Sequence, residues 1–298
     1  MLFIDVILPV FLMAFAGFLI ERKTEVDRHT LTNVSLLLFA PALVFSSLIQ
    51  RDVAAGLLTK LSLYMVLYTS LLTLLAILTA RAARFDSGTT RALILTTAMM
   101  NVGNFGLPLA YFAYGDKALD VSVLTFVLFN IPLGTLAIVV AQGKEVKWLE
   151  AVLNMMRIPI FHAVVLALLC KGIGWVPPKF ILRPIELLGQ AAIPVMLILL
   201  GMQLARSSVR DAWGFFGLST ALRLLVAPLL GIGLAFVLGI TGLARDVVIL
   251  QTSTPAAVLT LLYAIKFDTR PDLVSGSVLI STLTSAATLT LLLYWLTA

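Results

Sequence analysis

Two short polar segments interrupt long apolar runs at corresponding places in the two halves of this chain. The first is 101–108, Asn-Val-Gly-Asn-Phe-Gly-Leu-Pro, and the second is 251–257, Gln-Thr-Ser-Thr-Pro-Ala-Ala. A bilayer core has no water to pair with exposed backbone groups, so an interrupted helix at that depth must be buried in protein or line a polar cavity. Paired interruptions of this kind are typical of the substrate sites of secondary transporters.

The composition is that of an integral membrane protein. The 298 residues are 60% hydrophobic and 12% charged, with a mean hydropathy of +1.06. Apolar stretches of about twenty residues, enough to cross roughly 30 Å of hydrocarbon as helix, recur along the chain. We therefore predict an all-α polytopic protein with ten transmembrane helices, at about 2–20, 30–49, 61–80, 92–114, 121–141, 158–175, 184–205, 212–240, 246–265 and 272–297.

Positive charges gather on one side of the predicted spans. Thirteen of the 21 Lys and Arg residues lie in the loops that follow odd-numbered spans, and seven lie in the other loops. By the positive-inside rule, the odd loops are cytoplasmic and both termini lie outside the cytoplasmic membrane. The net charge of +6 is thus a topology signal for a protein embedded in a lipid bilayer, and it gives no support to a nucleic-acid partner.

An internal repeat is predicted from the spacing of the two polar segments. A shift of 152 residues places Tyr111 on Tyr263 and Asp116 on Asp268. Each repeat would hold five spans, an odd number, so the second repeat would enter the membrane from the opposite side. The predicted parts are a first five-helix repeat at 1–141, a short cytoplasmic linker at 142–157 and a second, inverted repeat at 158–298.

The first polar segment supplies five candidate substrate-binding residues, namely Asn101, Gly103, Asn104, Gly106 and Pro108. Glycine permits unusual backbone conformations, and proline removes a backbone donor, so we expect the helix to break near 103–108. A half-helix that begins after such a break presents free N–H groups and a partial positive charge, which suit a carboxylate.

The second polar segment supplies hydroxyl groups and a second break. Its candidate residues are Thr252, Ser253, Thr254, Pro255 and, further along, Thr260. An alternative is that proline and glycine merely kink two packed helices. The coincidence of two polar clusters with two matching breaks favours a binding site.

Two further polar residues lie inside predicted spans. Arg223 lies near mid-bilayer, where an unpaired cation is costly and is a functional candidate by default. It could attract an anionic substrate, or it could hold backbone carbonyls freed by Pro228. Asn33 could line the cavity, or it could form a hydrogen bond between helices.

These motifs resemble those of the auxin efflux carrier family, whose bacterial members include organic-acid permeases such as malonate carriers. The resemblance spans the whole chain. Its most specific parts are 101–108, the stretch 221–228 (Ala-Leu-Arg-Leu-Leu-Val-Ala-Pro), Thr254-Pro255-Ala256-Ala257 with Tyr263 and Asp268, and the stretch 33–41.

The resemblance implies ten helices in two inverted repeats, with helices 4 and 9 broken where they cross and a substrate carboxylate held at the crossing. It puts Asn101, Gly106 and Pro108 on one side, and the stretch from Pro255 to Thr260 on the other. It also implies a homodimer. The predicted function is a secondary transporter that moves a small organic anion, such as malonate or an auxin-like carboxylate, by alternating access.

Other classes of protein fit the sequence less well. An intramembrane enzyme would need a nucleophile or paired acids, yet the sequence has no His-Glu-x-x-His or Gly-x-Ser-x-Gly motif. We expect no metal or cofactor, and the broken spans lack the carboxylates found at the sodium sites of related symporters. A ligand sensor or channel with the same fold stays open as an alternative.

Overall fold

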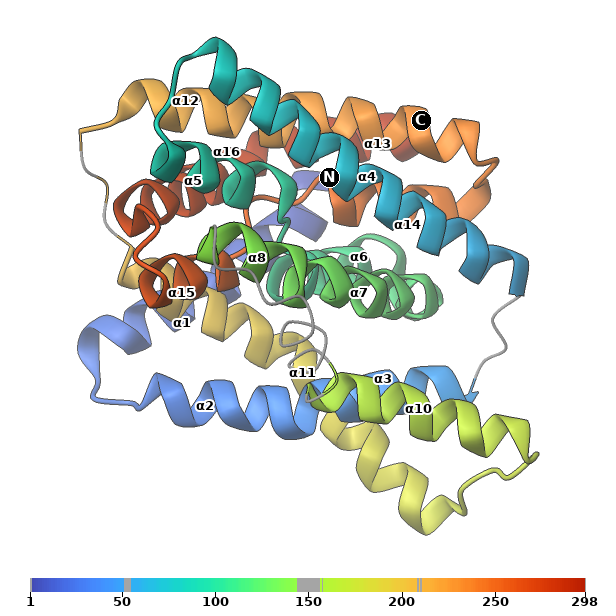
Figure 1. The fold of residues 1–298 in the computed structure, drawn as a ribbon. Coiled ribbons are helices and arrows are strands. Elements are labelled where there is room, and N and C mark those ends of the chain that lie inside the picture. Colours follow the sequence, from blue (N-terminus) through green and yellow to red (C-terminus); the bar gives the residue numbers. More distant parts are fainter. Residues whose placement is uncertain are drawn as a thin grey trace.

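A computed structural model describes residues 2–50, 55–143, 156, 158–207, 209 and 211–297, and every element of this part of the chain is helical (Figure 1). Most of the predicted linker, 144–155 and 157, lies outside the described residues. In chain order the elements are η1 (Phe3–Ile7), α1 (Leu8–Lys23), α2 (Arg28–Val34), η2 (Ser35–Phe39), α3 (Ala40–Gln50), α4 (Ala55–Ala82), α5 (Ser87–Ala98), η3 (Val102–Gly106), α6 (Leu107–Tyr114), η4 (Gly115–Ala118), α7 (Leu119–Gly134), α8 (Leu136–Gln142), α10 (Pro159–Gly172), α11 (Lys179–Ala205), α12 (Trp213–Ala221), η5 (Leu222–Val226), α13 (Ala227–Val237), α14 (Gly242–Thr252), α15 (Leu259–Lys266) and α16 (Pro271–Thr297).

The helices form two layers. In the first layer, α1 packs along α11, and α3 packs on both α10 and α11. The second layer comprises α4 to α8 and α12 to α16, with α4 against α5, α7 and α13. Figure 1 shows α2, α3, α10 and α11 together below the bulk of the second layer. The layers meet where α11 packs on η3 and α6, and where α3 packs on α7.

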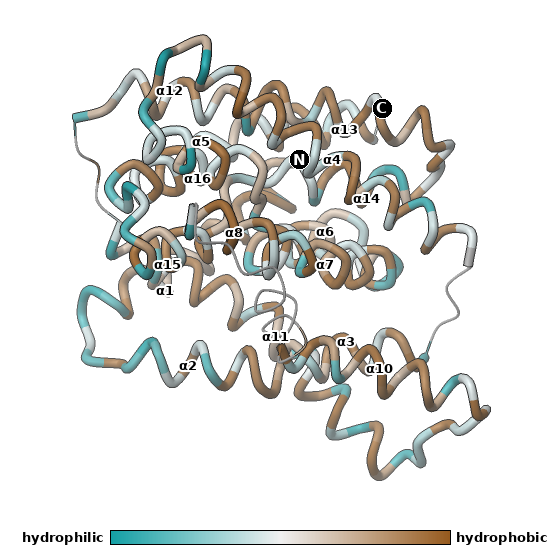
Figure 2. Tube along the Cα trace, viewed as in Figure 1, coloured by the Kyte–Doolittle hydropathy of each residue, from teal (hydrophilic) through white to brown (hydrophobic). Residues whose placement is uncertain are grey.

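The outer surface of the helices is suited to lipid. Large apolar side chains are exposed on both layers, for example Leu37 and Phe236, the latter 86% exposed. An apolar surface of this extent marks a membrane protein. Figure 2 shows apolar residues along the bodies of the helices and hydrophilic residues concentrated at the turns between them.

Seven helical segments of the described residues are long and apolar enough to cross a membrane, and Pro159–Gly172 is a shorter apolar helix. The segments are Phe3–Lys23, Arg28–Gln50, Gly56–Ala82, Val102–Gln142, Lys179–Ala205, Trp213–Val237 and Pro271–Thr297. Helices α5, α14 and α15 have 8 to 12 residues each. None of these three reaches the roughly twenty residues that a continuous span requires.

Each π-helical turn of the described residues is followed by a proline at the second position of the next α-helix. Proline has no N–H and its ring clashes with the carbonyl four residues earlier. A π turn widens the helix there; before Pro108, for instance, the N–H of Leu107 donates to Val102 O, five residues back. The helix therefore continues through the proline. The four pairs are η1 with Pro9, η2 with Pro41, η3 with Pro108 and η5 with Pro228.

The first layer is held together by a close approach of α1 and α11. A Cβ on Gly17 would overlap the carbonyl group of Ile198, and a Cβ on Gly201 would overlap that of Ala14. Lipid chains are as apolar as the helices, so helix association in a membrane depends on such close packing of small residues. The two glycines face each other's helix backbone and set the distance between the helices.

We expect Gly201→Ala to destabilise the protein by about 1–3 kcal/mol or more, because the added methyl group meets rigid backbone. The measurement is the thermal unfolding midpoint in detergent. Gly233→Ala, in α13, is the matched control, since nothing lies within 4 Å of its added Cβ. A Gly201→Ala variant as stable as the Gly233→Ala variant would contradict the packing role.

Candidate functional site

Two helices of the second layer are interrupted, and their interruptions pair with each other. Helix α5 ends at Ala98 and α14 ends at Thr252. The segments that follow run antiparallel: Asn101 N–H donates to Pro255 O at 2.8 Å, and Ala257 N–H donates to Met99 O at 2.9 Å. We call residues 99–101 and 253–258 the crossing. Here four helix ends meet inside the protein. Backbone groups that lost their intrahelical partners in one break form hydrogen bonds with those of the other break.

The first break lies earlier than the sequence predicts. We expected it near 103–108, but it falls at Met99–Asn101 and the helix resumes at Val102. The π turn η3 lets the helix pass Pro108, which takes the tolerated N-terminal position of α6. Among the described residues, neither Gly103 nor Gly106 has a positive φ.

These two glycines are required for space. A Cβ on Gly103 would lie 2.7 Å from Cε2 of Phe126 on α7. A Cβ on Gly106 would lie 3.3 Å from both Asn101 O and Thr254 Cγ2. Because these two glycines have no side chain, η3 can pack tightly against α7 and against the second break.

Asn101 occupies the N-terminal end of η3 and is 5% exposed. Its carbonyl accepts from Gly106 N–H at 2.8 Å, while its Nδ2 has no partner among the described residues. The first N–H groups of any helix lack acceptors in that helix. A buried amide donor therefore stands beside N–H groups of η3 that can bind an anion. Gly103 and Asn104, in the same turn, are partly exposed.

The hydroxyl groups of the second segment are committed to their own backbone. Thr252 Oγ1 donates to Val248 O at 2.7 Å, and Ser253 Oγ donates to Ile249 O at 2.7 Å. Thr254 and Thr260 bond in the same way to Gln251 O and Ala257 O, each at 2.6 Å. These hydroxyls use their hydrogen atoms to stabilise the interrupted backbone. They can therefore only accept further hydrogen bonds.

Arg223 is fully buried and bridges the ends of both interrupted helices. Its Nη1 donates to Thr97 O, in the last turn of α5, at 2.8 Å. Its Nη2 donates to Thr252 O, at the end of α14, and to the hydroxyl of Tyr68 at 2.8 Å. The last carbonyls of a helix have no partner within it and carry partial negative charge. The guanidinium group thus supplies both donors and positive charge where two negative helix ends converge.

The sequence leaves two roles open for Arg223, binding an anionic substrate or holding backbone carbonyls. This geometry is that of a residue that holds backbone carbonyls. The carbonyls differ from those that the sequence suggested, because they belong to α5 and α14 and are not freed by Pro228. Two tyrosines of α4 complete the arrangement: Tyr68 donates to Thr252 O at 2.6 Å, and Tyr64 lies 2.9 Å from Thr252 Oγ1. Sequence reasoning missed both tyrosines, since buried aromatic residues are common in any apolar helix.

Asn33 lies apart from the crossing. It is on α2 in the first layer, and its Nδ2 is 2.9 Å from His29 Nδ1, one turn earlier. Helix α2 packs on η2 and α11. The structure brings the other candidate residues together around the crossing, and a substrate-binding role of Asn33 stays a prediction.

Two polar pockets lie where the layers meet, near opposite ends of α11. One, of about 270 Å³, includes Glu186 near the start of α11; the other, of about 580 Å³, includes Arg206 at its end. These positions are roughly 30 Å apart along the helix. The second layer contributes Asp116, Leu119 and Asp120 to one pocket, and seven residues to the other, among them Asp268, Pro271 and Asp272. The two trios are offset by 152 residues, which is the shift of the predicted repeat.

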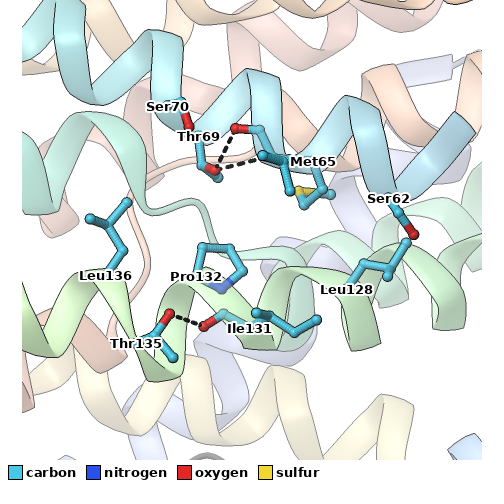
Figure 3. Close-up of a pocket in the computed structure, with 10 residues that line it drawn as sticks. Ser62, Met65, Thr69, Ser70, Leu128, Ile131, Pro132, Thr135 and Leu136 are labelled. Carbon is cyan, nitrogen blue, oxygen red and sulfur yellow. Dashed lines mark hydrogen bonds between the residues drawn. The ribbon is translucent and has the colours of Figure 1, made fainter. Parts of the chain in front are cut away.

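A third pocket, of about 260 Å³, lies between α4 and the segment α7–α8 (Figure 3). Its lining is mainly apolar, and several hydroxyls in it donate to their own helices. Thr69 bonds to Met65 O at 2.8 Å, Thr135 to Ile131 O at 2.6 Å and Ser62 to Leu58 O at 2.8 Å. This pocket offers little to a carboxylate.

The model of a family described as membrane transport protein matches residues 2–150 and 145–293. The chain belongs to this family. The match covers both breaks of the crossing and confirms the family resemblance read from the motifs. A multi-pass membrane transporter is therefore established as the class of this protein.

Relatives with transporter names accompany the family match. An "Uncharacterized transporter" of Methanothermobacter thermautotrophicus is 30% identical over 96% of both chains. A second from Methanocaldococcus jannaschii is 23% identical over 93% of this chain and 94% of its own. A protein of Rhizobium meliloti named "Putative malonate transporter" is 29% identical over 65% of this chain and 63% of its own length.

We expect Arg223→Met to destabilise the protein by about 3 kcal/mol or more, because carbonyls at two helix ends lose a buried charged donor. The measurement is again thermal unfolding in detergent. Arg245→Met serves as the control: its guanidinium pairs with Asp246 at 2.8 Å in an exposed position, where a pair contributes at most about 1 kcal/mol. Equal effects of the two substitutions would show that Arg223 does not hold the crossing.

Proposed function

We propose that this protein is a secondary transporter that binds the carboxylate of a small organic anion at the crossing. The observation that carries the proposal is the unpaired Nδ2 of buried Asn101 beside the N-terminal turn of η3. A helix N-terminus combines free N–H groups with a partial positive charge, so it is suited to a carboxylate. Asn101, Gly103 and Asn104 are the proposed contacts on this side, with Gly106 and Pro108 shaping the turn.

The electrostatics of the four helix ends support an anion. Each helix end carries a charge of roughly half a unit, positive at the N-terminus and negative at the C-terminus. Arg223 donates to carbonyls at the C-terminal ends of α5 and α14, so those negative ends are compensated. The N-terminal ends of η3 and α15 keep their positive charge. In this proposal, Arg223 positions the crossing and does not contact the substrate.

On the side of α15, we propose that Pro255 and Thr260 shape the second half of the site. Thr252, Ser253 and Thr254 precede them and use their hydroxyls to stabilise the break. The N–H groups of Thr260 and Leu261 already donate to Ala257 O and Val258 O, so this half contributes the partial positive charge at the start of α15. Because the broken spans end near the crossing, the bound anion would lie near the middle of the bilayer.

We further propose ten spans in two inverted five-helix repeats, with alternating access between the two pockets at the ends of α11. The equal offset of 152 residues between three residues of each lining supports a repeat. Movement of one layer against the other would open one pocket toward the crossing while closing the other.

We propose a location in the cytoplasmic membrane with both termini outside, and assembly as a homodimer. Malonate is the first substrate to test, since one relative carries that name.

We expect Asn101→Ala to reduce carboxylate transport by about tenfold or more, because a buried hydrogen bond to a charged group is lost. Uptake of radiolabelled malonate, lactate and indole-3-acetate into liposomes measures the effect. Asn130→Ala is the control, since Asn130 is also buried in the second layer but its Nδ2 donates to Phe126 O of its own helix at 2.8 Å. If the folded Asn101→Ala protein transports as the unmodified protein does, the carboxylate is not bound there. Rapid ion currents without exchange of substrate would instead indicate a channel.

A further inference from the structure

A cluster of unpaired polar atoms lies beside the crossing, outside the contacts assigned above. Ser122 Oγ, Thr125 Oγ1 and Gln251 Oε1 have no hydrogen-bond partner among the described residues. All three side chains are fully buried. Leaving a buried polar atom unpaired costs about 1–3 kcal/mol, and native proteins contain few such atoms. Three together indicate a place where a polar ligand group binds.

The three side chains come from two helices that enclose η3. Ser122 and Thr125 are one turn apart on α7, so they share a face. Gln251 is on α14, and its Nε2 donates to Ser122 O at 3.3 Å. Its Cγ lies 3.5 Å from the position of a Cβ on Gly106. The cluster therefore borders the turn at which Asn101 and η3 would hold the carboxylate.

The two hydroxyls of α7 lack the bond to their own helix that many buried hydroxyls of the second layer form, and Thr97 and Ser277 lack it too. A buried Ser or Thr in a helix usually donates to a carbonyl three or four residues earlier. Thr96 does so with Ala92 O at 2.9 Å, and Thr282 does so with Val278 O at 2.7 Å. Ser122 and Thr125 do not. Their hydroxyls are free to pair with a ligand on the side of Gln251.

We propose that Ser122, Thr125 and Gln251 form a subsite for an uncharged hydroxyl or carboxylic-acid group of the substrate. The proposal rests on the function proposed above and extends it to the substrate class. A hydroxyl group both donates and accepts, so it can donate to Gln251 Oε1 and accept from a serine or threonine hydroxyl. The subsite itself consists of neutral groups; Arg223 donates through both Nη groups to carbonyls and Tyr68, and its Nε is the one donor that has no partner among the described residues.

A neutral subsite excludes a second ionised carboxylate, because a buried charge without a partner is strongly disfavoured. The substrate would then carry one negative charge and one uncharged group that forms hydrogen bonds. Short hydroxy acids and half-protonated dicarboxylates, such as hydrogen malonate, have this chemistry. Plain monocarboxylates would leave the subsite unpaired, and fully ionised dicarboxylates would bury an uncompensated charge.

The test compares equilibrium binding of 3-hydroxypropionate and butyrate, which differ by a hydroxyl in place of a methyl group, to the purified protein. We expect the hydroxy acid to bind roughly ten- to a hundredfold more tightly. Ser122→Ala/Thr125→Val should reduce this preference by about fivefold or more without loss of butyrate binding. Thr135→Val is the control, because that hydroxyl already donates to Ile131 O.

Equal binding of the two acids to the unmodified protein would overturn the subsite and leave the proposed function intact. The subsite would also be overturned, in favour of a cation site, by one result for the Ser122→Ala/Thr125→Val variant. In that result the variant still prefers 3-hydroxypropionate over butyrate, but sodium no longer increases the binding of either acid. Failure to bind or transport any carboxylate in the panel would contradict the proposed function itself. Should the double variant not fold, Gln251→Met tests the same preference, since it removes the acceptor Oε1 and keeps the side-chain length.

Discussion

The buried guanidinium of Arg223 is the interaction on which the interior of the second layer depends. Breaking two helices inside a membrane leaves two sets of carbonyl groups without water. Arg223 donates to Thr97 O and Thr252 O, and Tyr68 adds a second donor to the latter. A cation at that depth is costly alone, but here the ends of two helices compensate it. The same contacts hold α5, α14, α4 and η5 in one unit.

Arg223 compensates the negative C-terminal ends of α5 and α14, and this leaves a net positive charge at the crossing. With the negative ends of the two half-helices paired to Arg223, the N-terminal ends of η3 and α15 are the uncompensated charges. The backbone pairing of Met99 and Asn101 with Ala257 and Pro255 fixes the distance between them. In this account, transport depends on a rigid crossing in the second layer and on movement along its contacts with α1, α3 and α11.

The sequence predicts the helical class, the family and the presence of two breaks, because proline, glycine and polar residues in apolar runs are visible signals. It misplaces the first break because a π turn carries the helix through Pro108. The hydrogen bond of that turn, from Leu107 N–H to Val102 O five residues earlier, could not be predicted from the residue types. It also leaves Arg223 ambiguous. Its partners are backbone carbonyls, which have no sequence signature. Tyr68, Ser122 and Thr125 could not be predicted, because only packing shows which polar groups face the crossing.

The most direct test of the central claim is a crystal structure with a bromine-labelled carboxylate, such as 3-bromopropionate, located by its anomalous scattering. The account predicts a bromine peak beside the crossing, with the carboxylate at Asn101 and the first turn of η3, and Arg223 still bonded to Thr97 O and Thr252 O. A peak confined to the pockets at the ends of α11, or a carboxylate bound directly to Arg223, would contradict it.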